Sequence, residues 1–252
     1  MSPSAVLTAL PRAGSGSDAG PAATRRPSPQ AQRIPADDRV ERIGILGGTF
    51  DPPHVGHLWL ASLAADSLDL ARVLFMPAAQ PPHKRRRGMS SITDRLLMTR
   101  LAITGNPRFE LSTLEVGRPG PSYTVDSVEE LQRTYADARL FLLMAADSLA
   151  QIDAWHEPDR LLSLIEWAVG PRPGTELPSA STLQERFGDA AARIHLLDGP
   201  ALDVSATAIR QRVAAGQTIR YLVPQAVEEL ILEKGLYRRR AHPGGTSPGG
   251  RE

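Results

Sequence analysis

The sequence contains no cysteine, which excludes disulfides, thiolate zinc sites and a cysteine nucleophile. It also lacks a marked excess of charge of either sign, because 29 basic residues against 28 acidic ones give a net charge of +1. That balance predicts no polyanion-binding surface, so nucleic acid is not an expected partner. No apolar run is long enough to cross a bilayer, and the N-terminus has no apolar core typical of a secretory signal. These absences favour a cytoplasmic protein without a membrane partner.

The chain does have enough apolar sequence for one sizeable core or two small ones, with 41% hydrophobic residues in a length of 252. Residues 1–40 are rich in Pro, Ala, Ser and Gly without an apolar period, and we expect a disordered N-terminal extension there. An organelle transit peptide is the alternative, which the acidic residues of this segment weaken. Residues 238–252 begin with three arginines and continue into a Gly/Pro stretch, which predicts a disordered C-terminal tail. The folded domain is therefore expected over residues 41–237.

Between these tails, predicted strands and helices alternate. Short apolar runs predict strands at residues 43–47, 73–76, 109–114, 140–144, 166–170 and 194–197. Helical spacing predicts helices at residues 55–68, 94–104, 124–135, 205–216 and 224–234, with Thr124 and Ser205 as capping residues. The alternation predicts an α/β fold, a Rossmann-like doubly wound and mostly parallel sheet with helices on both faces. Ligands bind such sheets beyond the carboxyl ends of the strands, where strand order reverses.

A glycine-rich run follows the first predicted strand and reads GILGGTFDPPHVGH at residues 44–57. Backbone N–H groups at a helix N-terminus attract anions, and the glycines let the backbone approach them closely. His54 and His57 are three residues apart, so they add two donors on one helix face. The run therefore predicts a phosphate site that is neither a P-loop nor a dinucleotide fingerprint. Two alternatives stay open: ordinary capping histidines, or a zinc pair, which would need a third ligand.

A second candidate anion site lies toward the C-terminal end, where residues 205–210 read SATAIR. The plain interpretation is a helix cap followed by an arginine on the solvated face. The functional interpretation is another helix N-terminus, on which Thr207 and Arg210 share a face. Such a site would hold the phosphates of a nucleotide and stabilise a departing pyrophosphate.

Further candidates lie near other predicted strands. Asp147, after the fourth strand, is interpreted either as a helix cap or as an acceptor for ribose hydroxyls. Lys84 lies in a basic loop beside two prolines and is a candidate to reach an anionic substrate, with a merely solvated loop as the alternative. Trp155 is interpreted either as core packing or as a stacking partner for a flat ring. Residues 122–124, which read SYT at a helix start, offer backbone donors for a carboxylate or phosphate.

Together these motifs carry a resemblance to a known family. The run at residues 47–57 resembles the signature of nucleotidyltransferases with His-x-Gly-His, and residues 205–210 resemble their second signature. The motifs PPHK, GPSYT, ADSLA followed by Trp155, and YLVP with a closing Gly-Leu-Tyr at residues 235–237 are similar to those of bacterial nicotinate-nucleotide adenylyltransferases. The resemblance covers roughly residues 42–238. Two residues depart from the family pattern, Ala145 in place of the common glycine and Ala206 in place of the common serine.

The resemblance implies that the phosphate of nicotinate mononucleotide attacks the α-phosphorus of ATP, giving deamido-NAD and pyrophosphate in NAD biosynthesis. It implies catalytic roles for His54, His57 and Arg210. It assigns ATP binding to Gly47, Gly48, Thr49, Phe50, Asp147, Ser205 and Thr207, and substrate binding to Lys84, Ser122, Tyr123, Thr124 and Trp155. Magnesium is expected to arrive with ATP, without a dedicated protein cage. Assembly into a homo-oligomer is left open.

Three other functions also stay open at this point. The nearest is an enzyme of the same superfamily with another acceptor, such as nicotinamide mononucleotide, phosphopantetheine or a sugar phosphate. Residues 122–124 and Trp155 disfavour a pantetheine arm because they suit a flat charged ring. A non-catalytic nucleotide sensor on the same fold is disfavoured by the complete histidine pair and by Arg210. Nucleic-acid binding through the arginine-rich loop and the C-terminal tail is the third, and it would show a steep salt dependence.

Overall fold

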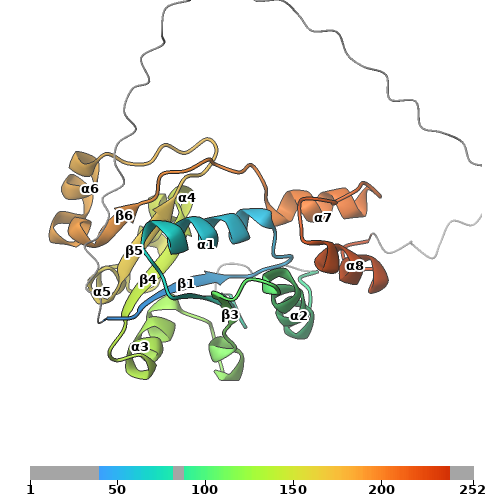
Figure 1. Ribbon diagram of the computed structural model, residues 1–252, viewed down its shortest axis with the longest axis horizontal. Helices are drawn as coiled ribbons and strands as arrows, with labels where there is room; N and C mark the ends of the chain where they lie inside the picture. Colours follow the sequence, from blue (N-terminus) through green and yellow to red (C-terminus); the bar gives the residue numbers. More distant parts are fainter. Residues whose placement is uncertain (1–39, 82–87, 239–252) are drawn as a thin grey trace, which may run out of the picture. The chain divides into compact units, whose positions relative to one another are not determined.

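The computed structural model describes residues 40–81 and 88–238, and within these ranges a six-stranded parallel sheet forms the centre of the domain (Figure 1). The predicted extension at residues 1–40 and the predicted tail at 238–252 fall almost wholly outside the described residues, as does Lys84. The described residues all belong to one compact unit, Ala31–Glu252. Across this part of the chain, no helix is both long and apolar enough to cross a membrane.

The strands lie in the order β3-β2-β1-β4-β5-β6. In chain order they are β1 (Arg42–Gly48), β2 (Arg72–Pro77), β3 (Phe109–Leu111), β4 (Arg139–Ala145), β5 (Glu166–Gly170) and β6 (Ile194–Leu196). Every neighbouring pair is parallel. Strands covered on both faces need apolar residues at successive positions, which explains the short apolar runs of the sequence. The predicted doubly wound sheet is confirmed, and its strand order reverses between β1 and β4.

Helices cover both faces of the sheet. They are α1 (Val55–Ser67), α2 (Ile92–Ile103), α3 (Thr124–Thr134), α4 (Ala146–Ala150), α5 (Pro158–Leu164), α6 (Ala180–Phe187), α7 (Ala206–Ala214) and α8 (Gln225–Glu233), with 3-10 turns η1 (Leu114–Gly117), η2 (Ile152–Ala154) and η3 (Gly188–Arg193). On one face, valines and leucines of α3 and α5 pack against Ile43 and Ile45 of β1. On the other face, the buried alanines of α1 pack against Phe75 and Phe141. Small side chains let α1 lie close to the sheet, which fixes the start of that helix above the end of β1.

The structure differs from the sequence prediction in its short elements. The apolar pattern leaves residues 146–165 and 171–193 without a predicted helix, yet α4, α5 and α6 lie there. These helices have five, seven and eight residues, too few to show a helical period, so tertiary packing must stabilise them. β3 ends at Leu111, and the expected end of that strand becomes η1. The predicted cap at Thr124 is wrong, because the extended Tyr123 precedes α3 and no side chain caps this helix.

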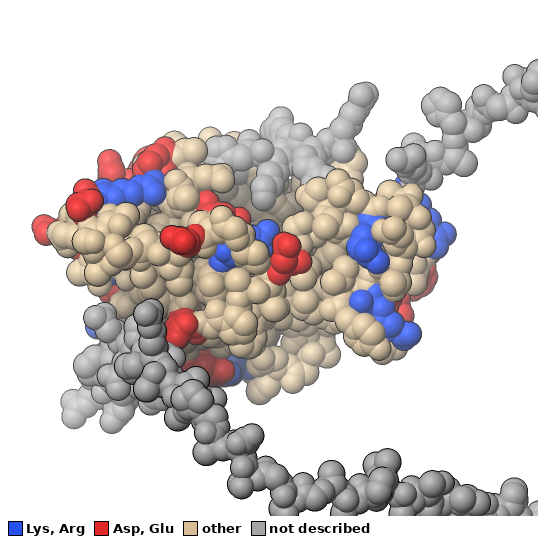
Figure 2. All heavy atoms as spheres, turned by 90° about the horizontal axis from the view of Figure 1, so that it is seen from above, with Lys and Arg blue, Asp and Glu red and all other residues tan. Residues whose placement is uncertain are grey.

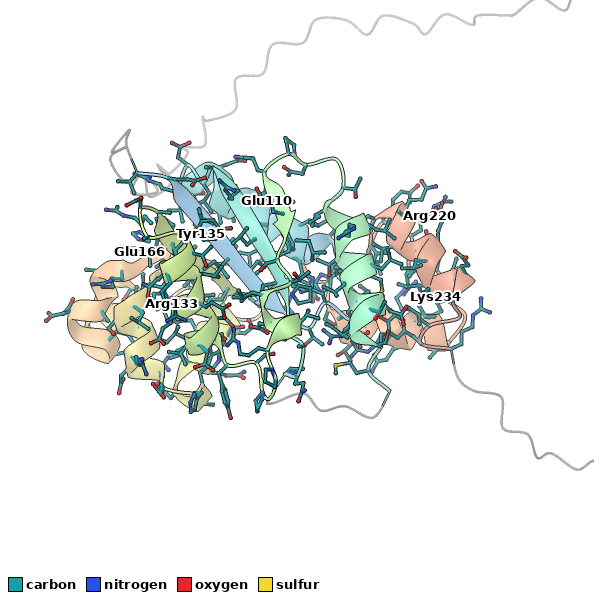
Figure 3. All side chains as sticks on the ribbon, turned by 90° about the horizontal axis from the view of Figure 1, so that it is seen from below. Glu110, Arg133, Tyr135, Glu166, Arg220 and Lys234 are labelled. Carbon is teal, nitrogen blue, oxygen red and sulfur yellow. The ribbon has the colours of Figure 1, made fainter. Side chains whose placement is uncertain are left out.

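A third group of helices packs beside the sheet. α2, α7 and α8 share an apolar cluster that includes Met98, Ile209 and Ile231. Lys234 Nζ and Asp94 Oδ1 form an ion pair of 2.5 Å that joins the end of α8 to the start of α2. Figure 3 labels Lys234 on this group of helices. Through this packing the N-terminus of α7 is brought to the carboxyl edge of the sheet.

Candidate active site

The turn from β1 into α1 places the glycine-rich run at the carboxyl edge of the sheet, where strand order reverses. A Cβ on Gly47 would meet no described atom within 4 Å, so the space beside this residue is open. Phe50 turns the chain in the left-handed region with φ 49°, and its ring is 1% exposed. That ring packs edge-on against His57, with 5.0 Å between ring centroids, and would lie 3.2 Å from a Cβ on Gly48. The buried ring of Phe50 therefore packs against His57, and only the backbone of Phe50 is left open to a ligand.

His54 and His57 stack on each other at the start of α1, with 3.7 Å between ring centroids and 26° between ring planes. His54 is the N-cap and is 6% exposed, whereas His57 lies in the first turn and is half-buried. The backbone N–H of His54 donates to His57 Nδ1 over 3.2 Å, and this bond assigns the proton of a neutral His57 to Nε2. A Cβ on Gly56 would lie 3.1 Å from His54 Nδ1. Gly56 is therefore a candidate position that the sequence prediction omits, although the His-x-Gly-His spacing contains it.

His54 is neutral in the folded protein at neutral pH. Burial, together with the positive charge of Arg172, lowers the pKa of His54 from 6.5 to about 4. Its Nδ1 is buried and has no hydrogen-bond partner among the described residues. A neutral imidazole offers one N–H donor and one acceptor, so His54 can donate to a phosphate oxygen without being a cation. The negative charge of a bound phosphate would in turn raise its pKa.

The low pKa of His54 predicts a loss of stability in acid. Between pH 6.5 and about 4 the ring takes up a proton in the unfolded chain but stays neutral in the folded one, so stability falls as pH falls. The gap of about 2.5 pKa units corresponds to roughly 3 kcal/mol. Urea unfolding at pH 7.0 and 4.5 measures it: His54→Gln should lose about 2–3 kcal/mol less than the wild-type protein over this interval. Equal losses in the two proteins would show that His54 is not buried in its neutral form.

The second anion motif meets the first across the fold. Arg210 Nη1 donates to the carbonyl oxygen of Asp51 over 2.5 Å, and Arg210 Nη2 donates to Thr207 Oγ1 over 2.8 Å. Ser205 caps α7 by accepting a hydrogen bond of 3.2 Å from the N–H of Ala208. The capping role of Ser205 and the shared face of Thr207 and Arg210 are confirmed. The interpretation of Arg210 as a solvated side chain is wrong, because this residue is 9% exposed. The N-termini of α1 and α7 therefore lie at one site.

Asp147 lies at the same edge, in the first turn of α4. Its interpretation as a helix cap is wrong, because Ala145 is the N-cap and no side chain caps α4. Asp147 Oδ2 lies 3.4 Å from Arg172 Nε, and Arg172 Nη1 donates to the carbonyl oxygen of Val204 over 3.2 Å. Arg172 is a candidate that the sequence prediction omits. The available signal was its position just beyond the carboxyl end of a predicted strand.

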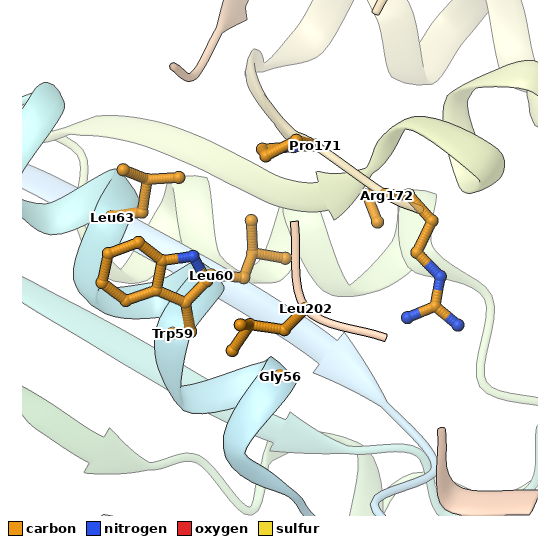
Figure 4. A pocket seen from close by; sticks show the side chains of 8 residues that line it. Gly56, Trp59, Leu60, Leu63, Pro171, Arg172 and Leu202 are labelled. Atoms are coloured by element: carbon orange, nitrogen blue, oxygen red, sulfur yellow. The ribbon is translucent and has the colours of Figure 1, made fainter. Parts of the chain in front are cut away.

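A hollow of about 40 Å³ adjoins the histidine pair, between α1 and the loop that follows β5 (Figure 4). Its lining is mostly apolar and comprises Gly56, Trp59, Leu60, Leu63, Ala145, Pro171, Arg172 and Leu202. Trp59 is anchored at its rim, since its Nε1–H donates to the carbonyl oxygen of Pro200 over 2.8 Å. The methyl group of Ala145, where the family pattern has glycine, narrows this hollow.

Arg95 supports the glycine-rich turn after β1 from within the protein. This residue of α2 is 1% exposed. Its Nη1 donates to the carbonyl oxygens of Thr49 over 2.9 Å and Ala78 over 2.7 Å, and its Nη2 donates to that of Ala79 over 3.3 Å. Burial lowers the pKa of Arg95, but a guanidinium stays protonated in proteins. One buried cation thus joins the turn after β1 to the turn after β2, a role that no local sequence pattern indicates.

The acceptor-side candidates lie around the N-terminus of α3. Ser122 is tied to the turn after β2, because its N–H donates to the carbonyl oxygen of Gln80 over 3.0 Å and its Oγ accepts from the N–H of Gln80 over 3.2 Å. Tyr123 stacks on His156, with 4.0 Å between ring centroids. Trp155, the neighbour of His156, is half-buried and packs against the core. The predicted residues Ser122, Tyr123 and Trp155 are therefore brought to one region.

The face of the domain in Figure 2 carries both acidic and basic side chains and has no large patch of one charge. Several arginines are paired with carboxylates, among them Arg72 with Glu41 and Glu110, and Arg108 with Asp66. Proteins that bind nucleic acid need positive charges that can neutralise phosphates. The arginine-rich loop and nearly all of the C-terminal tail, on which the nucleic-acid alternative depends, lie outside the described residues.

Comparisons with known proteins find similar sequences and folds. Residues 45–212 match the family model described as cytidylyltransferase-like. A protein of Thermomicrobium roseum named probable nicotinate-nucleotide adenylyltransferase is 49% identical over 199 residues, which cover 79% of this chain and 92% of that protein. One of the same name from Herpetosiphon aurantiacus is 43% identical over 79% of this chain and 99% of its own. Plasmodium falciparum nicotinic acid mononucleotide adenylyltransferase complexed with NaAD has a similar fold, with a TM-score of 0.66 at 16% identity over 78% of this chain and 97% of that chain.

Proposed function

Because the chain belongs to the nicotinate-nucleotide adenylyltransferase family, we propose that its site transfers the adenylyl group of ATP to nicotinate mononucleotide, giving deamido-NAD and pyrophosphate. The observation that carries the proposal is the meeting of two helix N-termini, those of α1 and α7, joined by Arg210. Each N-terminus attracts anions. In the proposed arrangement the N-terminus of α1 binds the α-phosphate and the N-terminus of α7 binds the departing pyrophosphate.

In the proposed step, a phosphate oxygen of nicotinate mononucleotide attacks the α-phosphorus of ATP and forms a new P–O bond. The bond from the α-phosphorus to the oxygen that bridges to the β-phosphate breaks, and pyrophosphate leaves with that electron pair. In such transfers the protein contributes mainly by positioning the reactants and by stabilising the charge that develops on the phosphates. We assign His54 and His57 as N–H donors to oxygens of the α- and β-phosphates, with His57 donating through Nε2.

The leaving group is assigned to the N-terminus of α7. Arg210 is held in place by its bonds to Asp51 and Thr207, so its positive charge is fixed where charge grows on pyrophosphate. The open space beside Gly47 lets the backbone of the turn approach ATP. Asp147 is assigned to the ribose hydroxyls.

Magnesium is proposed to enter as part of the substrate, bound to the phosphates of ATP. Among residues 40–81 and 88–238, no group of three or more His, Cys, Asp or Glu side chains could hold a metal ion. Mg²⁺ usually keeps several waters and is held through substrate phosphates. We therefore assign the ion to phosphate oxygens and water, and no protein side chain is given a role in holding it.

The acceptor is proposed to lie at the N-terminus of α3. The backbone N–H groups of Tyr123 and Thr124 would receive the nicotinate carboxylate, since that of Ser122 is bonded to Gln80, and Trp155 would stack on the pyridine ring. The bond between Ser122 and Gln80 fixes these donors against the turn after β2. A helix N-terminus favours negative charge, so this placement stabilises the bound carboxylate. It stabilises the neutral carboxamide of the nicotinamide form less.

An acceptor panel tests the proposal. The protein is incubated with MgATP and, in turn, nicotinate mononucleotide, nicotinamide mononucleotide and phosphopantetheine, and both pyrophosphate and the coupled product are measured. We expect kcat/KM for the nicotinate form to exceed that for the nicotinamide form by at least about 10-fold, as the loss of one charge-assisted hydrogen bond implies. Preferred turnover of another acceptor would reassign the substrate. ATP binding without turnover of any acceptor would identify a nucleotide-binding protein instead.

A further inference from the structure

Tyr237 lies near the end of the described residues but contacts the phosphate-binding turn. Its hydroxyl donates a hydrogen bond to Asp51 Oδ1 over 2.7 Å. Asp51 is 3% exposed, and its carbonyl oxygen accepts the bond of 2.5 Å from Arg210. One residue of the glycine-rich run therefore receives Tyr237 on its side chain and Arg210 on its backbone. The reaction as assigned above gives Tyr237 no part.

Backbone strain accompanies both ends of this contact. Phe50, the residue before Asp51, has φ 49°, and Tyr237 has φ 63°. These angles lie in the left-handed region, which residues other than glycine adopt at a cost. Such conformations persist only where surrounding contacts over-determine them, and they are concentrated at functional sites. Here Arg95 holds the carbonyl oxygen of Thr49 on one side of the turn, and Tyr237 holds Asp51 on the other.

The hydroxyl of Tyr237 is kept as a donor. Burial and the negative charge of Asp51 raise the pKa of Tyr237 well above its usual value of 10.0, so the phenol stays protonated. A buried carboxylate that loses a hydrogen-bond donor is left unsatisfied, and the chain around it must rearrange. Removing this hydroxyl therefore acts on the turn and not only on the packing of the C-terminal segment.

We propose that Tyr237 is a positioning residue for adenylyl transfer. Through its bond to Asp51 it fixes the turn that leads to His54, together with the Asp51 carbonyl oxygen to which Arg210 donates. The inference rests on the proposed function above. His54 follows Asp51 by three residues, so movement of the turn displaces the stacked histidines and Arg210 together. A misplacement of about 1 Å can cost up to about 10²-fold in rate.

Tyr237→Phe tests this role, with Tyr221→Phe as the matched control. Tyr221 belongs to the same C-terminal part of the chain, but its side chain is 84% exposed. We expect Tyr237→Phe to lower kcat about 10-fold and to leave the KM of each substrate within about twofold, because only alignment in the transition state is lost. Tyr221→Phe should keep wild-type kinetics. Circular dichroism at the assay temperature gives the folded fraction, by which each kcat is corrected.

A double-mutant cycle with Asp51→Ala, which removes the acceptor of the Tyr237 hydroxyl, completes the test. If Tyr237 acts through Asp51, the double variant should lose no more than the worse single variant, within about threefold. The inference would be overturned if the losses of kcat in the two single variants multiply in the double variant. It would also be overturned if Tyr237→Phe keeps the wild-type kcat, or if the folded fraction of that variant accounts for its loss of kcat. If the wild-type protein turns over no acceptor, the proposed function fails, which is a distinct result from failure of the Tyr237 contact.

Discussion

Replacing His57 with alanine is expected to lower kcat for adenylyl transfer about 10²–10³-fold, the cost of removing one fixed donor from an oxyanion site. His57 Nδ1 accepts from the N–H of His54, so a neutral His57 ring carries its proton on Nε2. In the proposed role, the hydrogen bond from His57 to the phosphate strengthens as charge develops, so the loss should appear mainly in kcat, with the KM for MgATP changed by less than about fivefold. Steady-state kinetics on the purified, folded variant measures both constants.

His195→Ala is the control for the loss of an imidazole. His195 Nε2 lies 2.7 Å from Oε2 of Glu166, the first residue of β5, so this pair does not belong to the carboxyl edge of the sheet. Its removal should leave kcat within about twofold of wild type, even where the thermal midpoint falls. His57→Gln, which keeps one donor and one acceptor, should recover part of the lost rate. Near-normal turnover by a folded His57→Ala protein would exclude His57 from the mechanism.

The parts of the site that the sequence predicted correctly are those built from local signals. A buried strand, a glycine turn and a helix start follow one another at residues 44–57, so their shared position at the sheet edge follows from parallel topology. Thr207 and Arg210 are three residues apart on one helix, and that spacing alone predicts a shared face. The capping role of Ser205 has the same local origin.

The parts that escaped prediction depend on contacts between distant segments. Arg95 meets Thr49 across 46 residues, Arg210 meets Asp51 across 159, and Tyr237 meets Asp51 across 186. No periodicity connects such partners, because they are set by the order of the strands and by the packing of α2, α7 and α8. The low pKa of His54 is of the same kind, since it arises from burial and from the charge of a residue after β5.

Gly56→Ala is expected to lower kcat about 10–100-fold in a protein that stays folded. The added Cβ would lie 3.1 Å from Nδ1 and 3.2 Å from Cε1 of His54. That ring is 6% exposed and stacked on His57 at 3.7 Å, so it cannot move away without disturbing the pair. A shift of a few tenths of an ångström up to about 1 Å in a phosphate-binding group is enough for losses of this size. Rate measurements at saturating MgATP and acceptor report the effect.

Stability should change little, because the helix propensity of alanine opposes the cost of the close contact with His54, and this separates the loss of rate from unfolding. In the first turn of α1 the backbone of Gly56 has no positive φ, and alanine is a better helix former than glycine by up to about 1 kcal/mol. Gly117→Ala is the matched control, because a Cβ there would meet nothing within 4 Å among the described residues and its φ is not positive. That control should keep wild-type kcat. A Gly56→Ala protein with full activity and an unchanged thermal midpoint would show that the ring of His54 can shift without loss of catalysis. The stacked pair would then not be the catalytic arrangement.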